Sequence, residues 1–103
     1  MELLNINLIS SIEVKDPVEE PFYSLIDGLV ITKSMGVKTE TPVLEFIEQR
    51  KYLCVENNTI CHKRKIIITM NNGTEHTKMF DTKKEQEAFY RQSSFDLLKY
   101  ITI

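Results

Sequence analysis

The sequence has few of the residues that interrupt or cross-link a chain. Its 103 residues include three glycines, three prolines, two cysteines and no tryptophan. Collagen-like, linker-rich and mucin-like segments depend on glycine or proline, so this composition excludes them. The chain also has no low-complexity stretch and no repeat at the periods of solenoids or propellers.

Long apolar runs are also missing. No run approaches the roughly 18 apolar residues that a membrane-spanning helix requires, so we expect no membrane association. Glu2 stands where a secretory signal would carry lysines, and Asn5 and Asn7 interrupt the apolar stretch that such a signal needs. We therefore expect a cytoplasmic protein, in the producing or a host cell. Lysine outnumbers arginine, and isoleucine and asparagine are abundant, which favours an AT-rich gene from a phage or low-GC bacterium.

The residues that are present are typical of a folded soluble chain. Apolar residues make up 42% and charged residues 27% of the sequence. The length matches one domain, so we predict a single α+β domain over residues 1–103 with one core. The net charge is −2, with acids concentrated in the first half and bases in the second. Such asymmetry can orient a partner.

The N-terminal residues alternate between apolar and polar. Leucine, isoleucine and valine recur at every second position from Leu4 to Val14, with Ser10 as the exception. This period of two predicts one half-buried strand. Residues 16–21 contain two prolines, which remove backbone donors and favour extended geometry, and predict an exposed loop.

Residues 22–48 allow more than one interpretation. The stretch from Phe22 to Lys33 lacks clean alternation. We favour a continuous strand with a bulge at Gly28 over a short helix that ends near Gly28 and precedes a strand. Residues 34–42 read as a loop whose final proline ends the loop or starts a helix. Residues 43–48 fit a helix or a strand, so an extra short helix within 22–48 remains open.

Two hairpins are predicted in the C-terminal half. Asn57-Asn58 separates two strand-like runs, and asparagine tolerates the left-handed conformation that tight turns need. Asn72-Gly73 lies between two further runs and is a strong short-range hairpin signal. We therefore predict an antiparallel sheet of about four to five strands.

A C-terminal helix should cover that sheet. Thr82 and Glu85 have the spacing of a capping box, in which each side chain satisfies the other's backbone amide. The predicted apolar members of the helix are Ala88, Phe89, Phe95, Leu97, Leu98 and Ile101. Among them Ala88, Phe95 and Leu98 recur near the helical period and should face the sheet.

The first hairpin places the two cysteines opposite each other. If Asn57-Asn58 form the turn, Cys54 pairs with Cys61, and their β-carbons lie about 4.5–5.5 Å apart, slightly beyond the separation a relaxed disulfide prefers. They are a candidate redox pair. Two reduced cysteines packed as small hydrophobic side chains are the favoured alternative, because disulfides are rare in the cytosol.

A metal site is disfavoured by the same pairing. The softest ligands available are Cys54, Cys61, His62 and His76. Cys61 and His62 are consecutive on a strand and project to opposite faces, whereas tetrahedral zinc needs converging ligands. We expect no metal and no cofactor.

The pairing also gathers positive charge near the hairpin. It brings Arg50 opposite Lys65, Lys51 opposite Arg64, and Tyr52 opposite Lys63. Cations beside an aromatic ring are what single-stranded nucleic acid binds, through phosphate contacts and base stacking. Like charges opposite one another destabilise a sheet, however, so these charges either serve a partner or show that the assumed register is wrong.

No catalytic constellation is apparent. The sequence has no nucleophile elbow and no phosphate-binding glycine loop, so we do not expect an enzyme. The favoured hypothesis is a small protein-binding accessory or inhibitor protein of phage or mobile-element origin. One alternative is single-stranded nucleic-acid binding through the basic hairpin at residues 50–65, and a second is a small enzyme or redox-sensitive protein. A homo-oligomer that forms through a sheet edge is a further hypothesis, with the N-terminal strand as the candidate.

Overall fold

A computed structural model describes residues 2–34, 36–93 and 99–103. The chain divides into two compact units. The terminal unit comprises Met1–Asp16 with Arg64–Ile103, and the central unit comprises Pro17–Lys63. Each unit contains its own cluster of buried apolar side chains, where a single core was expected. That the two units form one cooperative domain stays a prediction.

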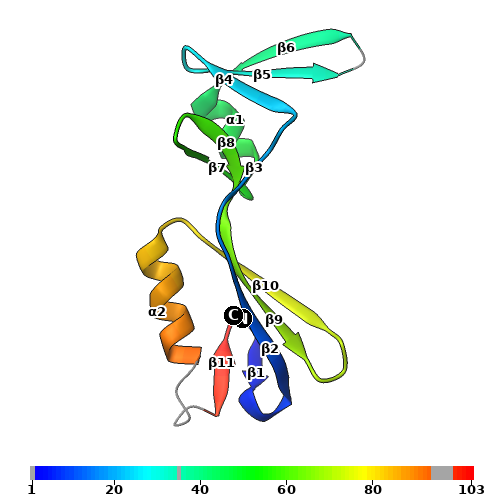
Figure 1. The fold of residues 1–103 in the computed structure, drawn as a ribbon, viewed down its shortest axis with the longest axis vertical. Coiled ribbons are helices and arrows are strands. Elements are labelled where there is room, and N and C mark those ends of the chain that lie inside the picture. Colours follow the sequence, from blue (N-terminus) through cyan, green and yellow to red (C-terminus); the bar gives the residue numbers. More distant parts are fainter. Residues whose placement is uncertain (1, 35, 94–98) are drawn as a thin grey trace. The chain divides into compact units, whose positions relative to one another are not determined.

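The terminal unit contains two antiparallel sheets (Figure 1). Strands β2 (Ile9–Lys15), β9 (Arg64–Met70) and β10 (Glu75–Phe80) form one sheet in the order β10-β9-β2. Strands β1 (Leu3–Asn5) and β11 (Tyr100–Thr102) form the other. The two ends of the described chain therefore lie side by side.

The predicted N-terminal strand is interrupted. A 3₁₀ turn, η1 (Ile6–Leu8), separates β1 from β2. The Asn7 backbone N–H donates to Asn5 Oδ1 at 2.9 Å. This local bond offers the backbone an alternative to the sheet ladder, which explains why a continuous strand was the wrong prediction.

The hairpin predicted at Asn72-Gly73 is confirmed, with a longer turn. β9 and β10 pair from Thr69 opposite Glu75, and the Met70 N–H donates to the Thr74 carbonyl at 2.8 Å. Three residues thus form the loop. Gly73 closes it at a φ of 88°, the left-handed position that such loops give to glycine.

Helix α2 (Lys83–Ser93) begins where the cap predicted. The Glu85 N–H donates to Thr82 Oγ1 at 3.2 Å. The buried side chains of α2 are Gln86 and Ser93, whereas Ala88, which was expected to face the sheet, is exposed. The predicted helix members Phe95, Leu97 and Leu98 lie outside the described residues.

The helix was predicted to be the last element of the chain, but strand β11 follows it. Ile101, assigned to the helix from sequence, is the central residue of β11 and pairs with Leu4. The burial expected for Ile101 is confirmed. The strand has only three residues, too few to show the period of two that distinguishes a strand from a helix.

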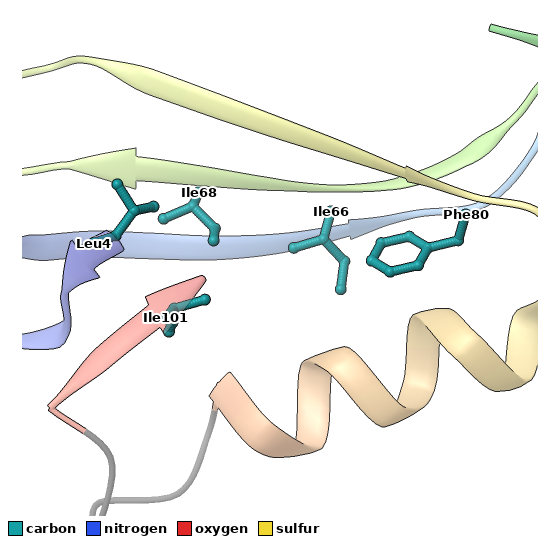
Figure 2. Packing of buried hydrophobic residues seen from close by; sticks show 5 residues of the cluster. All are labelled: Leu4, Ile66, Ile68, Phe80 and Ile101. Carbon is teal, nitrogen blue, oxygen red and sulfur yellow. The ribbon is translucent and has the colours of Figure 1, made fainter. Parts of the chain in front are cut away.

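The core of the terminal unit lies between the two sheets and α2 (Figure 2). Its buried members come from β1, β9, β10 and β11, and they are Leu4, Ile66, Ile68, Phe80 and Ile101. Phe89 of α2 packs on this cluster, with its ring centroid 5.4 Å from that of Phe80.

One polar side chain joins α2 to the sheet. Gln86 is only 2% exposed, and its Nε2 donates to the carbonyls of Lys15 at 2.9 Å and Lys65 at 3.0 Å. Lys15 and Lys65 are paired across β2 and β9. The side-chain amide therefore bridges two strands with both of its N–H groups in use.

The central unit has a three-stranded sheet with the order β3-β8-β7. Strands β7 (Leu53–Glu56) and β8 (Thr59–His62) form the predicted hairpin, with φ of 51° at Asn57 and 59° at Asn58. The predicted loop at 16–21 contains strand β3 (Val18–Glu19), which pairs with β8. Proline beside a strand is compatible with this position because β3 lies at the sheet edge.

A second sheet of the central unit has the order β4-β5-β6 (Figure 1). Its strands are β4 (Tyr23–Ile26), β5 (Leu29–Ser34) and β6 (Val37–Pro42). The favoured continuous strand with a bulge was wrong, because Asp27 and Gly28 form a two-residue hairpin turn with φ of 49° and 75°. The alternative was wrong about a helix before Gly28, where β4 lies, but its strand from Leu29 is confirmed. The loop predicted at 34–42 is likewise largely strand.

The short helix left open in this region is present as α1 (Val43–Gln49). Its Phe46 is buried with Val30 of β5, Leu53 of β7 and Ile60 of β8. The α+β class and antiparallel pairing are thus confirmed. The described residues hold eleven strands in four sheets, more than the four to five predicted. None of the helices in the described part is long and apolar enough to cross a membrane.

Candidate functional site

The six residues of the predicted basic hairpin are divided between the two units. Arg50, Lys51, Tyr52 and Lys63 belong to the central unit, whereas Arg64 and Lys65 begin β9 of the terminal unit.

The predicted pairing of Arg50 with Lys65 is wrong. Lys65 is opposite Met79 on one side and Lys15 on the other, which leaves it no third neighbour in the sheet. Arg64 is opposite Phe80, so its predicted pairing with Lys51 is wrong as well. The predicted neighbourhood of Tyr52 and Lys63 is retained, since the Lys63 N–H donates to the Tyr52 carbonyl at 2.9 Å.

The Arg50 and Tyr52 side chains have contacts within the central unit. The Arg50 guanidinium lies 4.1 Å from the centroid of the Phe46 ring, a cation–π contact. The Tyr52 ring lies 5.8 Å from the His62 ring. Of the six residues only Lys51 and Tyr52 are exposed. A groove for nucleic acid needs several accessible cations, so this arrangement gives the nucleic-acid hypothesis little support.

His62 forms a side-chain contact that the sequence did not indicate. Its Nε2 lies 2.8 Å from Oε2 of Glu20, whose side chain is 17% exposed. A nucleophilic site consists of a nucleophile, a base and a group that orients the base, and an imidazole oriented by a carboxylate matches the last two. Cys61, the adjacent thiol, projects to the opposite face of β8, so it cannot complete that site.

The two cysteines lie opposite each other as predicted. Both are thiols, Cys61 buried and Cys54 half-buried. The hydrogen bond from Lys63 to Tyr52 shows which pairs of this ladder exchange hydrogen bonds, and Cys54–Cys61 is one of them. Such pairs have a Cα separation of about 5.5 Å, with side chains further apart than in the alternate pairs. This Cα separation lies within the range that disulfides span.

The other histidine lies in the terminal unit. His76 Nδ1 is 3.4 Å from Glu2 Oε2, beside a hollow of about 450 Å³ that Lys78 and Ile103 also line. Across residues 2–34, 36–93 and 99–103, no three histidine, cysteine or acidic side chains gather where they could hold a metal ion.

The feature that sequence reasoning missed is the outer face of the β4-β5-β6 sheet. Tyr23, Leu25 and Val30 point inward to the central core. Because side chains alternate, Ile26, Leu29 and Ile31 point outward. We call these three side chains, with the adjoining Ser24, Lys38, Glu40 and Pro42, the outer face.

The outer face has an apolar centre and a polar margin. Ile26 is 54% exposed, and Leu29 and Ile31 are half-buried. Lys38 and Glu40 on neighbouring β6 form an ion pair at 3.6 Å. The signal in the sequence was the missing alternation of residues 22–33, which is what a strand with two apolar faces produces.

Comparison with known proteins gave no match to a family model, to a curated protein or to a solved structure.

Proposed function

We propose that this chain is a protein-binding protein of the accessory or inhibitor type, and that the outer face contacts the partner. The supporting observation is the row of three aliphatic side chains, Ile26, Leu29 and Ile31, on a sheet whose other face already contributes to a core. Apolar surface that is contiguous and rimmed by polar groups is characteristic of interaction sites.

The margin carries charge of both signs. Lys38 and Glu40 form an ion pair there at 3.6 Å. An apolar centre with a mixed polar rim matches the anatomy of protein–protein interfaces. The occupant is therefore expected to present an apolar patch of its own.

Two substitutions with equal starting exposure test the proposal. Ile26 and Leu8 are each 54% exposed, and Leu8 lies in the terminal unit. Immobilised wild-type protein, Ile26→Lys and Leu8→Lys are each exposed to two portions of lysate from the source cell, one treated with nuclease and one untreated. The bound proteins are then quantified by mass spectrometry.

We expect a partner that wild-type protein and Leu8→Lys retain equally and that Ile26→Lys loses at least about tenfold, because a lysine in the contact leaves a desolvated charge. Equal retention by all three proteins would place the contact elsewhere. Binding that nuclease removes would favour the nucleic-acid alternative and reject the protein-binding proposal.

A further inference from the structure

The outward edge of β6 is the strongest remaining feature of the central unit. β6 is the last strand of its sheet, and five of its six residues are exposed, Thr41 being half-buried. An uncovered strand edge presents backbone N–H and C=O groups that can pair with another strand.

The hydrogen bonds of the sheet show which residues present these groups. The Val43 N–H donates to the Gly28 carbonyl at 3.0 Å, and residues 28 and 43 continue the β5–β6 register. Hydrogen-bonded pairs recur at every second position of an antiparallel ladder. Thr39 and Thr41 therefore bond toward β5, while Lys38 and Glu40 direct their backbone groups outward.

The geometry points to a second copy of this chain as the partner of this edge: we propose that two β6 strands pair antiparallel about a two-fold axis at Thr39. Lys38 then lies opposite Glu40 of the other copy, and Glu40 opposite its Lys38. Each of these two pairs exchanges two backbone hydrogen bonds, four in all. The two Thr39 residues meet as the closer, non-hydrogen-bonded pair.

The neighbouring registers are unfavourable. A shift of two residues in one direction places Lys38 opposite Lys38, and a shift in the other places Glu40 opposite Glu40. Like charges directly opposite destabilise a sheet. The second shift also brings Lys38 opposite Pro42, which has no N–H to donate. Charge and proline together select the register centred on Thr39.

The resulting contact is isologous, because the same strand is used by both copies and the two-fold axis closes it. Two three-stranded sheets become one of six strands, a common size. The dimer needs no other protein, so its test is independent of the proposed partner at the outer face. The β6 edge is a different strand from the N-terminal one that the sequence suggested for self-association.

Charge reversal provides a decisive experiment. Lys38→Glu alone and Glu40→Lys alone each place like charges opposite in both pairs. An equimolar mixture of these two variants restores opposite charges in every pair, as does the double variant Lys38→Glu/Glu40→Lys. Glu45→Lys, an exposed charge reversal on α1, is the matched control. Far-UV circular dichroism checks that each variant folds.

Sedimentation equilibrium over a range of concentrations measures the mass. We expect the wild-type protein, the control, the double variant and the mixture to form dimers of the 12.0 kDa chain. Each single variant should dimerise at least about tenfold more weakly. A wild-type protein that stays monomeric at high concentration overturns the proposal. So do single variants that dimerise normally or a mixture that fails to recover the dimer.

Discussion

Truncation of Gln86 should destabilise the terminal unit far more than truncation of an exposed glutamine would. Gln86→Ala removes two hydrogen bonds to the carbonyls of Lys15 and Lys65 and leaves those carbonyls facing a small cavity. Each bond contributes about 1 kcal/mol net, and an unsatisfied buried acceptor costs about 1–3 kcal/mol. Alanine's better helix propensity returns only a few tenths of a kcal/mol. We expect a loss of about 3 kcal/mol in unfolding free energy.

The assay is urea unfolding followed by far-UV circular dichroism. With a denaturant slope of about 1.5 kcal/mol/M, a loss of about 3 kcal/mol lowers the midpoint by about 2 M. Gln92→Ala is the matched control, because Gln92 is exposed on the same helix and should change the free energy by less than about 0.5 kcal/mol.

A third variant separates bonding from packing. Gln86→Met keeps most of the side-chain volume and removes the amide group with both of its N–H donors, so it should lose about 2 kcal/mol, less than Gln86→Ala. If Gln86→Ala were no less stable than Gln92→Ala, the bridge between β2 and β9 would be irrelevant to stability, and the reasoning from burial would be refuted.

Three further predictions concern the turns, the helix cap and the thiols. Thr82→Ala should lower the unfolding free energy by about 1 kcal/mol, whereas Thr82→Ser, which keeps the acceptor, should not; equal losses in urea unfolding would contradict the cap. Asn58→Val should destabilise by about 1–2 kcal/mol because valine resists positive φ, while Asn58→Gly should not; the reverse order in thermal melts would argue against the turn. Titration with a thiol reagent should find two thiols with or without prior reductant, Cys54 reacting faster than buried Cys61; fewer thiols before reduction would support the redox alternative.

The elements that the sequence predicts well are those with strong local signals. Thr82 caps a helix because its hydroxyl bonds a nearby amide, and Asn57-Asn58 turns because asparagine tolerates positive φ. Both effects act within four residues and need no tertiary context.

The errors arose where tertiary pairing decides. β3 is two residues long and exists only because β8 lies beside it. From the sequence alone, the polar Gln86 is typical of a surface residue. Its burial follows from hydrogen bonds to carbonyls of β2 and β9, which are distant in sequence. The Asp27-Gly28 turn was visible in sequence, but the missing alternation around it concealed two strands with apolar residues on both faces.

The candidate sites also differ in whether local signals or tertiary pairing determine them. The Cys54–Cys61 pairing depends on a local hairpin and was predicted correctly. The basic hairpin required that pairing to continue past Lys63, but β9, which begins at Arg64, instead pairs with β2 and β10. The outer face could not be located without knowing that β4, β5 and β6 form one sheet.

The most direct test of the account is the affinity of the captured partner, measured by isothermal titration calorimetry against three proteins. The account predicts that Ile26→Lys binds at least about tenfold more weakly than the wild-type chain, a loss of about 1.4 kcal/mol, while Leu8→Lys binds within about twofold. Equal affinities for Ile26→Lys and wild type, or a loss with Leu8→Lys alone, would contradict the role of the outer face.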